Sequence, residues 1–287
     1  MRIGEFLTSA AARLIAAGID GADLEAALLL GHFLGQNRAS LLLHAEKKIP
    51  PSLLVEAEAA LARRLRREPL AYILGEQEFW SRSFAVSPAV LIPRPETEIV
   101  VECALEFYPH RDRPYRFLDL GTGSGILAIV LACEFPACRV IAVDRSRAAL
   151  AIAIENARRH GVADRVTFLQ GDWLGAVAPG AAFDLVVSNP PYIAEAVMDT
   201  LMPEVRDFEP HTALDGGKEG MRDITLLAGQ VAGVLKPDGW LFMEIGFDQG
   251  ELALKCFVST GKYDRVEVRP DYAGLPRALM ARRRVND

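Results

Sequence analysis

The fold of this 287-residue chain is decided by the stretch Phe183-Asp184-Leu185-Val186-Val187-Ser188-Asn189-Pro190-Pro191-Tyr192. Its first six residues are mostly apolar and predict a buried β-strand. The strand must end at the two prolines, because neither can donate a ladder hydrogen bond and both restrict the backbone. Asn189 therefore lies at the carboxyl end of a strand, which in an open α/β sheet is the edge where ligands bind.

The residues from Asn189 to Tyr192 suit a flat ligand that carries an NH2 group. The Asn189 carboxamide and the carbonyls beside the prolines are hydrogen-bond acceptors held in a fixed relation, and the Tyr192 ring offers a planar wall. These acceptors can take both N–H hydrogens while the ring packs against the plane of the group. For the tetrapeptide alone, a proline-rich turn without a ligand remains the alternative, since short motifs also match by chance.

Outward from this stretch, apolar strands and helices alternate along the chain. We predict strands at residues 116–120, 139–143, 165–169, 183–188, 240–245, 263–268 and 278–282. Helices are predicted between them, at residues 126–134, 147–160, 222–235 and 249–260. This alternation indicates an α/β fold in which helices cover both faces of a parallel sheet.

The N-terminal segment has a different pattern, rich in Ala and Leu with helical periodicity, and predicts a small helical domain over residues 1–71. Gly18 is expected to follow the end of the first helix and Asn37 to start the third. Four arginines form a basic cluster that is either a solvated helix face or a surface for docking a partner: Arg63, Arg64, Arg66 and Arg67. The segment contains no catalytic constellation, so we expect it to dock the substrate.

Residues 79–86 alternate in the manner of a β-hairpin, so residues 72–92 are predicted to form a hairpin linker. A catalytic domain is then expected over residues 93–287.

Composition excludes several classes of protein. The net charge of −6 argues against a protein that binds bare nucleic acid through its phosphates. No apolar run is long enough to span a membrane and the N-terminus lacks a signal pattern, so we expect a cytoplasmic protein. Four cysteines, without a C-x-x-C pair or a His at ligand spacing, indicate reduced thiols and no metal site: Cys103, Cys133, Cys138 and Cys256.

A glycine-rich turn, Gly121-Thr122-Gly123-Ser124-Gly125, follows the strand predicted at residues 116–120. Glycines let the backbone turn tightly and approach a ligand, with the N-terminus of a helix behind them. Asp144 ends the next strand, where its carboxylate can accept both hydroxyls of a ribose. The G-x-G-x-G spacing lacks the pyrophosphate cradle of a dinucleotide fold, and Asp119 adds a carboxylate. Together they favour a cationic, phosphate-free nucleoside, S-adenosylmethionine, over a nicotinamide or flavin cofactor.

Gly171-Asp172-Trp173 follows the third predicted strand. Asp172 can accept a hydrogen bond from the adenine amine, and Trp173 can cover the ring by stacking. A helix-capping Asp beside a core Trp is the alternative interpretation.

The chain resembles the peptide chain release factor N5-glutamine methyltransferases, which are class I S-adenosylmethionine-dependent methyltransferases, over nearly its whole length. The residues that carry this resemblance are Tyr72-Ile73-Leu74-Gly75, Glu78-Phe79-Trp80, Leu91-Ile92-Pro93-Arg94-Pro95-Glu96-Thr97-Glu98, Asp119 to Gly125, Ser188 to Tyr192 and Ala213-Leu214-Asp215-Gly216-Gly217-Lys218-Glu219-Gly220. It implies a mostly parallel, seven-stranded Rossmann-like sheet behind the helical domain. One departure is Ile224-Thr225, where family members often carry Tyr-Arg.

The resemblance also implies the activity and the site. Members methylate the side-chain amide nitrogen of the Gln in the Gly-Gly-Gln motif of class I release factors, producing S-adenosylhomocysteine. The cofactor would contact Gly121, Thr122, Gly123, Ser124, Gly125, Asp144, Asp172, Trp173 and Asn189. The glutamine would lie against Asn189, Pro190, Pro191 and Tyr192, with Asn189, Pro190 and Tyr192 as the catalytic residues. Arg94 and Glu96 would organise the loop beneath the site. We expect a monomer that binds release factors, no membrane and no specific nucleic acid sequence.

Two other activities share such a site. A glutamine methyltransferase for a ribosomal protein would use the same residues. An adenine or cytosine amino-methyltransferase also places a D/N-P-P-aromatic tetrad against a flat NH2 group, but the acidic charge and the lack of a separate base-recognition domain argue against it.

Overall fold

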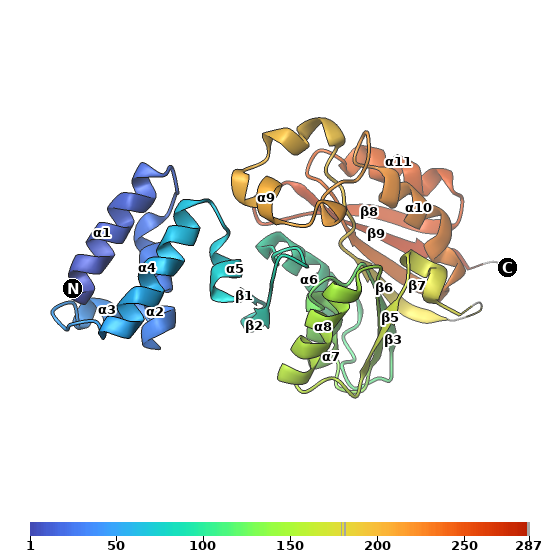
Figure 1. Ribbon diagram of the computed structural model, residues 1–287. Helices are drawn as coiled ribbons and strands as arrows, with labels where there is room; N and C mark the ends of the chain where they lie inside the picture. Colours follow the sequence, from blue (N-terminus) through green and yellow to red (C-terminus); the bar gives the residue numbers. More distant parts are fainter. Residues whose placement is uncertain (179, 181, 286–287) are drawn as a thin grey trace. The chain divides into compact units, whose positions relative to one another are not determined.

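The computed structural model describes residues 1–178, 180 and 182–285, coloured along the chain in Figure 1. The chain divides into two compact units. The helical unit consists of Met1–Glu76 together with Met202–Phe208, and the sheet unit of Gln77–Leu201 together with Glu209–Asp287. The chain therefore passes between the units at three points, after residues 76, 201 and 208.

The helical unit has its own apolar core, built around Phe6, Leu14, Leu30 and Leu61. Its helices are α1 (Ile3–Ala16), α2 (Ala22–Leu34), α3 (Arg38–Leu43), α4 (Pro51–Leu65), α5 (Leu70–Leu74) and α9 (Pro203–Phe208).

Both expected helix boundaries in this unit are confirmed. Gly18 follows α1 with φ of 69°, a left-handed conformation that glycine adopts without strain. The Asn37 carboxamide accepts a hydrogen bond from the Ser40 backbone at 2.9 Å and starts α3.

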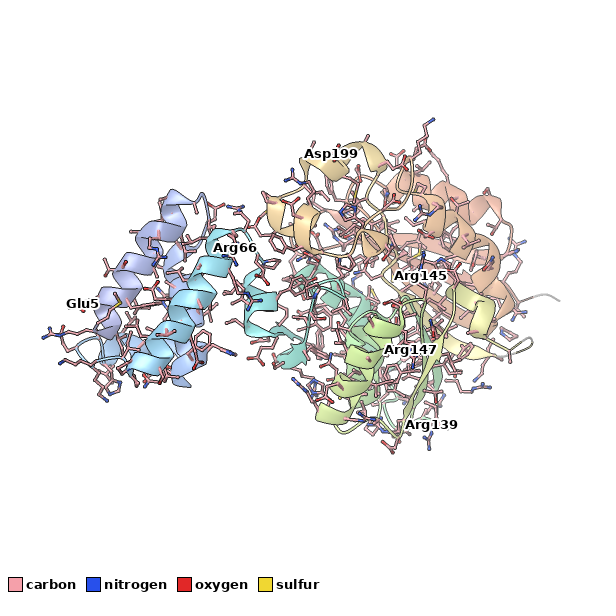
Figure 2. All side chains as sticks on the ribbon, viewed as in Figure 1. Glu5, Arg66, Arg139, Arg145, Arg147 and Asp199 are labelled. Carbon is pink, nitrogen blue, oxygen red and sulfur yellow. The ribbon has the colours of Figure 1, made fainter. Side chains whose placement is uncertain are left out.

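The interpretation of the arginine cluster as a solvated face or docking surface is wrong for two of its four members, Arg64 and Arg67. Arg64 is 5% exposed and binds Glu25 at 2.6 Å and Glu204 at 2.9 Å. Arg67 binds the second carboxylate oxygen of Glu204 at 2.8 Å and also donates to backbone carbonyls at the end of α1. Arg63 pairs with Glu68. Only Arg66, labelled in Figure 2, is exposed among these four. Arg64 and Arg67 thus fasten α9 into the helical unit.

A two-stranded hairpin, β1 (Glu76–Phe79) and β2 (Arg82–Ala85), follows the last helix of the N-terminal segment. Its turn residues, Trp80 and Ser81, have φ of 53° and 54°. Two successive positive φ angles give the turn that matches the twist of paired strands. Phe79 and Phe84 are buried in the core of the sheet unit, so the hairpin is packed in place.

The seven-stranded sheet has the order β5-β4-β3-β6-β7-β9-β8. Its strands are β3 (Arg116–Leu120), β4 (Arg139–Asp144), β5 (Val166–Gln170), β6 (Phe183–Ser188), β7 (Leu235–Glu244), β8 (Tyr263–Pro270) and β9 (Pro276–Arg283). The five strands from β5 to β7 run parallel, whereas β9 is antiparallel to both β7 and β8. This is the mostly parallel, seven-stranded sheet that the resemblance implies.

Successive residues of the central strands face two separate cores. Figure 1 shows the strands and the helices beside them. Phe117 packs in the core on one face, with α6 (Glu98–Phe107), α7 (Ile126–Glu134) and α8 (Arg147–Arg159), whereas Leu118 packs in the other. That second core contains α10 (Arg222–Gln230) and α11 (Gly250–Ser259). A sheet covered on both faces explains why its strands read as continuous apolar runs.

Short 3-10 helices occupy the connections: η1 (Pro95–Thr97), η2 (Trp173–Ala176), η3 (Glu195–Thr200), η4 (His211–Ala213) and η5 (Val231–Gly233). Over the described part of the chain, every helix falls short of the length and apolarity that crossing a membrane requires.

Candidate active site

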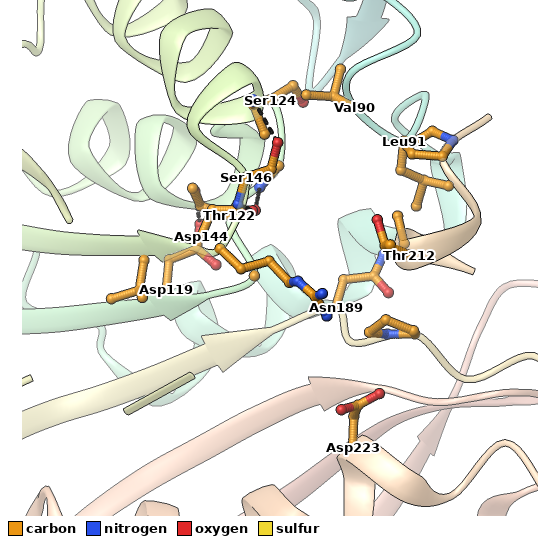
Figure 3. Close-up of a pocket in the computed structure, with 18 of the residues that line it drawn as sticks. Val90, Leu91, Asp119, Thr122, Ser124, Asp144, Ser146, Asn189, Thr212 and Asp223 are labelled. Atoms are coloured by element: carbon orange, nitrogen blue, oxygen red, sulfur yellow. Dashed lines mark hydrogen bonds between the residues drawn. The ribbon is translucent and has the colours of Figure 1, made fainter. Parts of the chain in front are cut away.

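A cavity of about 620 Å³ lies at the carboxyl ends of β3, β4 and β6 in the sheet unit. Figure 3 shows Asp119, Thr122 and Asp144 along one wall, with Asn189 across from them. The cavity thus brings together the glycine-rich turn and the Asn-Pro-Pro-Tyr segment, which are far apart in the sequence. Most of the predicted site residues line it: Gly121, Thr122, Gly123, Ser124, Asp144, Asp172, Trp173, Asn189 and Pro191.

Gly125 belongs to the turn but is not among the lining residues, and packing explains why a glycine is needed there. Its φ is 87°, and a Cβ atom would lie 2.8 Å from the Ile129 side chain and 3.1 Å from Ala153 Cβ. Gly125 therefore lets α7 start close against α8, whereas the glycines before it face the cavity.

Asp144 holds the glycine-rich turn in place. One carboxylate oxygen accepts a hydrogen bond from the Gly123 backbone and the other from the Ser146 backbone, both at 2.8 Å. A carboxylate has about four acceptor positions, so each oxygen keeps capacity for a further donor such as a ribose hydroxyl. The residue is half-buried and lines the cavity.

Asp119 is 1% exposed and forms part of the cavity wall. Its Oδ2 accepts from the Thr122 hydroxyl at 2.6 Å and from the Ala128 backbone at 3.1 Å. Its Oδ1 has no hydrogen-bond partner among the described residues. Burial raises the pKa of this carboxyl to about 7, against the opposing effect of these hydrogen bonds. A buried acceptor without a partner on a cavity wall can accept a hydrogen bond from a ligand there.

Trp173 has φ of 47°, an unusual conformation for a bulky residue. Its indole nitrogen donates to Asp223 at 3.2 Å. A Cβ atom on Gly121 would lie 3.3 Å from its ring, so the indole covers the glycine-rich turn. Asp172 precedes η2 but makes no side-chain capping bond. Because its carboxylate does not cap the helix, it can accept a hydrogen bond from a ligand in the cavity that Asp172 lines.

The Asn-Pro-Pro-Tyr segment divides into residues that face the cavity and residues that hold it from behind. The Asn189 carboxamide donates from Nδ2 to Thr97 Oγ1 at 3.2 Å. Pro190 is buried and Tyr192 is half-buried, and neither is among the residues that line the cavity. The Tyr192 hydroxyl donates to Glu244 at 2.9 Å, and burial raises its pKa.

The motif from Ala213 to Gly220 packs directly beneath this segment. A Cβ atom on Gly216 would lie 2.8 Å from the Pro191 carbonyl, and one on Gly220 would lie 2.2 Å from the Tyr192 carbonyl. The two glycines are therefore needed for backbone-to-backbone contact. Ile224, the first residue of the departing pair, is fully buried in the core, and neither Ile224 nor Thr225 lines the cavity.

Two buried carboxylates behind the cavity were missed by sequence reasoning. Glu244 is fully buried and accepts from the Thr97 hydroxyl at 2.6 Å. Glu209 accepts from the Ile92 backbone at 3.1 Å and pairs with Arg94 at 2.5 Å, so it ties down the loop that carries Arg94. Glu244 could have been recognised as a candidate from the sequence, because it is a charged residue at the end of an otherwise apolar predicted strand.

Side chains that could ligate a metal are scattered in this protein. Among the described residues, His, Cys, Asp and Glu side chains do not gather in any group of three or more that could hold an ion.

Comparison with known proteins places this chain in a family. Residues 5–75 match the PrmC N-terminal domain and residues 111–254 match a methyltransferase domain. A release factor glutamine methyltransferase of Nitratidesulfovibrio vulgaris is 44% identical, over 96% of this chain and 94% of that protein. The enzyme of the same name from Koribacter versatilis is also 44% identical, over 99% of both chains.

A methyltransferase structure from Pyrococcus furiosus superposes with a TM-score of 0.53 at 17% identity, covering 79% of this chain and all of that one. At such low identity the superposition supports the fold alone. The two sequence relatives are 44% identical to this chain over nearly its whole length, which supports membership of the same family. This chain therefore belongs to the release factor glutamine methyltransferase family.

Proposed function

We propose that this protein transfers a methyl group from S-adenosylmethionine to the side-chain amide nitrogen of a glutamine in a class I peptide chain release factor. The observation that carries the proposal is that the Asn189 carboxamide is fixed on the wall of the same cavity as the glycine-rich turn and Asp144. A hydrogen-bond acceptor for an amide thus shares one space with residues suited to a nucleoside.

The cavity suits this cofactor because its donor and acceptor groups match a phosphate-free cation. Asp119 Oδ1, which has no partner among the described residues, would receive the positive end of the ligand, while Asp144 would accept the ribose hydroxyls. Asp172 and Trp173 would hold the adenine. When bound, S-adenosylmethionine supplies an electrophilic methyl group on a positively charged sulfur.

Amide nitrogen is a poor nucleophile, because its lone pair is delocalised into the carbonyl. Asn189 Oδ1 would accept one of its two N–H hydrogens, which fixes the amide and makes the nitrogen more electron-rich. Pro190, predicted as the second acceptor, is buried and is not among the residues that line the cavity, so we assign it to stiffening the segment. Tyr192 is anchored to Glu244, so we assign it to shaping the segment from Asn189 onward. Positioning of this kind can supply about 7–11 kcal/mol of a barrier.

Loss of the amide proton needs no dedicated base in this scheme. No histidine or lysine is among the described residues that line the cavity. A methylated amide nitrogen that still carries both hydrogens is strongly acidic, so water suffices as the acceptor.

The helical unit is proposed as the substrate-docking domain. A single loop of a release factor buries less than the roughly 1,200–2,000 Å² of a specific protein interface, so a second contact surface is required.

Leu43, 81% exposed at the end of α3, is a candidate contact. Leu43→Glu should raise the KM for an intact release factor and leave that for a short Gly-Gly-Gln peptide unchanged. Leu252→Glu, at a residue 47% exposed in the sheet unit, is the matched control. Equal effects of the two substitutions would contradict the docking role.

The decisive experiment measures transfer of a labelled methyl group to three purified substrates side by side: a class I release factor, ribosomal protein and DNA. Label on the release factor that disappears when its Gly-Gly-Gln glutamine is replaced supports the proposal. Label on ribosomal protein or DNA in place of the release factor would overturn it.

A further inference from the structure

We propose that Glu244 determines which end of the Asn189 carboxamide faces the cavity, acting through the hydroxyl of Thr97. Glu244 is a positioning residue in this scheme, since it does not line the cavity. The inference deepens the proposed function and rests on it for the identity of the substrate, an amide that donates N–H hydrogens.

The three side chains form a chain of hydrogen bonds that leads away from the cavity wall. Asn189 Nδ2 lies 3.2 Å from Thr97 Oγ1, and Thr97 Oγ1 lies 2.6 Å from Glu244 Oε2. Thr97 and Glu244 are both 0% exposed, so water cannot substitute for either of them. The other carboxylate oxygen of Glu244 accepts from the Tyr192 hydroxyl at 2.9 Å.

The polarity of this chain follows from the number of protons available. Both oxygens of Glu244 accept hydrogen bonds, one from Thr97 and one from Tyr192, and a threonine hydroxyl has one proton to donate. Because that proton goes to Glu244, Thr97 Oγ1 presents a lone pair to Asn189. The carboxamide must then turn its NH2 group inward to Thr97. Its oxygen is left as the group that can accept from a ligand in the cavity.

The same argument explains why an asparagine, and not an aspartate, suits this position. In the variant Asn189→Asp, a carboxylate oxygen would face the lone pair of Thr97 Oγ1. The hydroxyl cannot donate to both carboxylates, so one of them loses its partner in a buried setting, which is costly. Glu244→Gln relieves this conflict, because the new amide can donate to Thr97 and free the threonine proton for the aspartate.

The test is a double-mutant cycle of Asn189→Asp and Glu244→Gln, with two readouts. The first is the melting temperature, measured without substrate or cofactor. The second is kcat and KM for methyl transfer to the release factor. We expect each single substitution to lower both the melting temperature and kcat. If the two substitutions acted independently, the double variant would show the product of their effects on kcat and the sum of their effects on the melting temperature. We expect its kcat to be at least about tenfold higher than that product predicts, and its melting temperature to be several degrees above that sum.

Thr97→Val and Thr97→Ser supply the matched pair. The valine has nearly the shape of threonine but no hydroxyl, so kcat should fall by at least about tenfold while the cofactor dissociation constant changes by less than about twofold. Serine retains the hydroxyl and should restore most of the turnover. In a Thr97→Val background, Glu244→Gln should add little further loss of kcat.

Additive effects in the cycle, in both melting temperature and kcat, would overturn the proposal. So would a Thr97→Val enzyme with the turnover of the Thr97→Ser enzyme. If the wild-type protein failed to methylate a release factor, the proposed function would fall, yet the melting temperatures would still report on the orientation of Asn189.

Discussion

In the wild-type protein, the dissociation constant of S-adenosylmethionine should depend on pH through the carboxyl group of Asp119. Replacing Asp119 by asparagine should abolish this contribution. Burial raises the pKa of Asp119 to about 7, from the usual 3.8. A bound cation favours the ionised carboxylate. Below pH 7 the protein must therefore release a proton in order to bind, and the dissociation constant should rise about tenfold for each pH unit by which the pH falls. Above pH 7 the carboxylate is already ionised, and this contribution to the pH dependence disappears.

The substitution Asp119→Asn removes the charge and keeps the shape of the side chain. The carboxamide oxygen can still accept from Thr122 and Ala128, and its NH2 group takes the place of the orphaned Oδ1. Without a charge-assisted hydrogen bond to the cation, binding at pH 8 should weaken by about 10- to 100-fold.

Calorimetric titration of S-adenosylmethionine into both proteins between pH 5.5 and 8.5 measures the difference. The amino group of the ligand, with a pKa near that of free α-amino groups, about 7.7–8.0, titrates in both experiments and cancels in the comparison. Parallel pH profiles for the two proteins would refute the assignment of Asp119 to the cationic part of the cofactor.

Three further outcomes are expected. Asp144→Ala should weaken cofactor binding by about 1.5–3 kcal/mol for each hydrogen bond that a ribose hydroxyl donates to the carboxylate, with little effect on the saturated rate; unchanged affinity in calorimetry would place the ribose elsewhere. Gly125→Ala should lower the unfolding free energy by about 1–3 kcal/mol more than Gly123→Ala does. Both substitutions place an alanine at a positive φ, which costs each about 1–2 kcal/mol, but only at Gly125 would the new Cβ overlap Ile129. Gly123→Ala should also weaken cofactor binding, and equal losses of stability in denaturant titrations would contradict this contrast. Arg64→Ala should cost about 3–5 kcal/mol of stability, because two largely buried carboxylates lose their shared guanidinium, and a cost below about 1 kcal/mol would mean that the ion pairs are solvated.

Local pattern was enough to predict the order of the strands and helices, but not every boundary. The helix predicted at residues 222–235 ends at Gln230, and the strand predicted from residue 240 begins at Leu235. The strand at 116–120 and the helix at 126–134 have the predicted bounds, because each is an apolar run terminated by residues with a clear backbone preference. The β5 strand was predicted one residue early, at Arg165 in place of Val166. Such a shift is expected where the end of a strand is determined by its pairing with the neighbouring strand, here β4, and not by its own residues.

The connection between Asn189 and Met221 was not predictable in the same way. It folds into η3, α9 and η4, all too short to show a periodicity, and α9 is held by ion pairs to arginines more than 130 residues earlier in the chain. Thr97 and Glu244 likewise lie 147 residues apart. Sequence reasoning named most of the predicted site residues that line the cavity, because glycine-rich turns and polar residues at strand ends mark them. It did not find the groups that orient them, because only the folded chain brings these together.

The three passages of the chain between its two units have a consequence for how the gene can change. An N-terminal domain joined by a single linker can be lost or exchanged by one recombination event. Here, deleting residues 1–76 would leave Met202–Phe208, which belong to the helical unit, in the remaining protein. Glu204 would then lose its ion pairs with both Arg64 and Arg67. Transferring the whole helical unit onto another methyltransferase would therefore require two grafts at distant sites in the sequence.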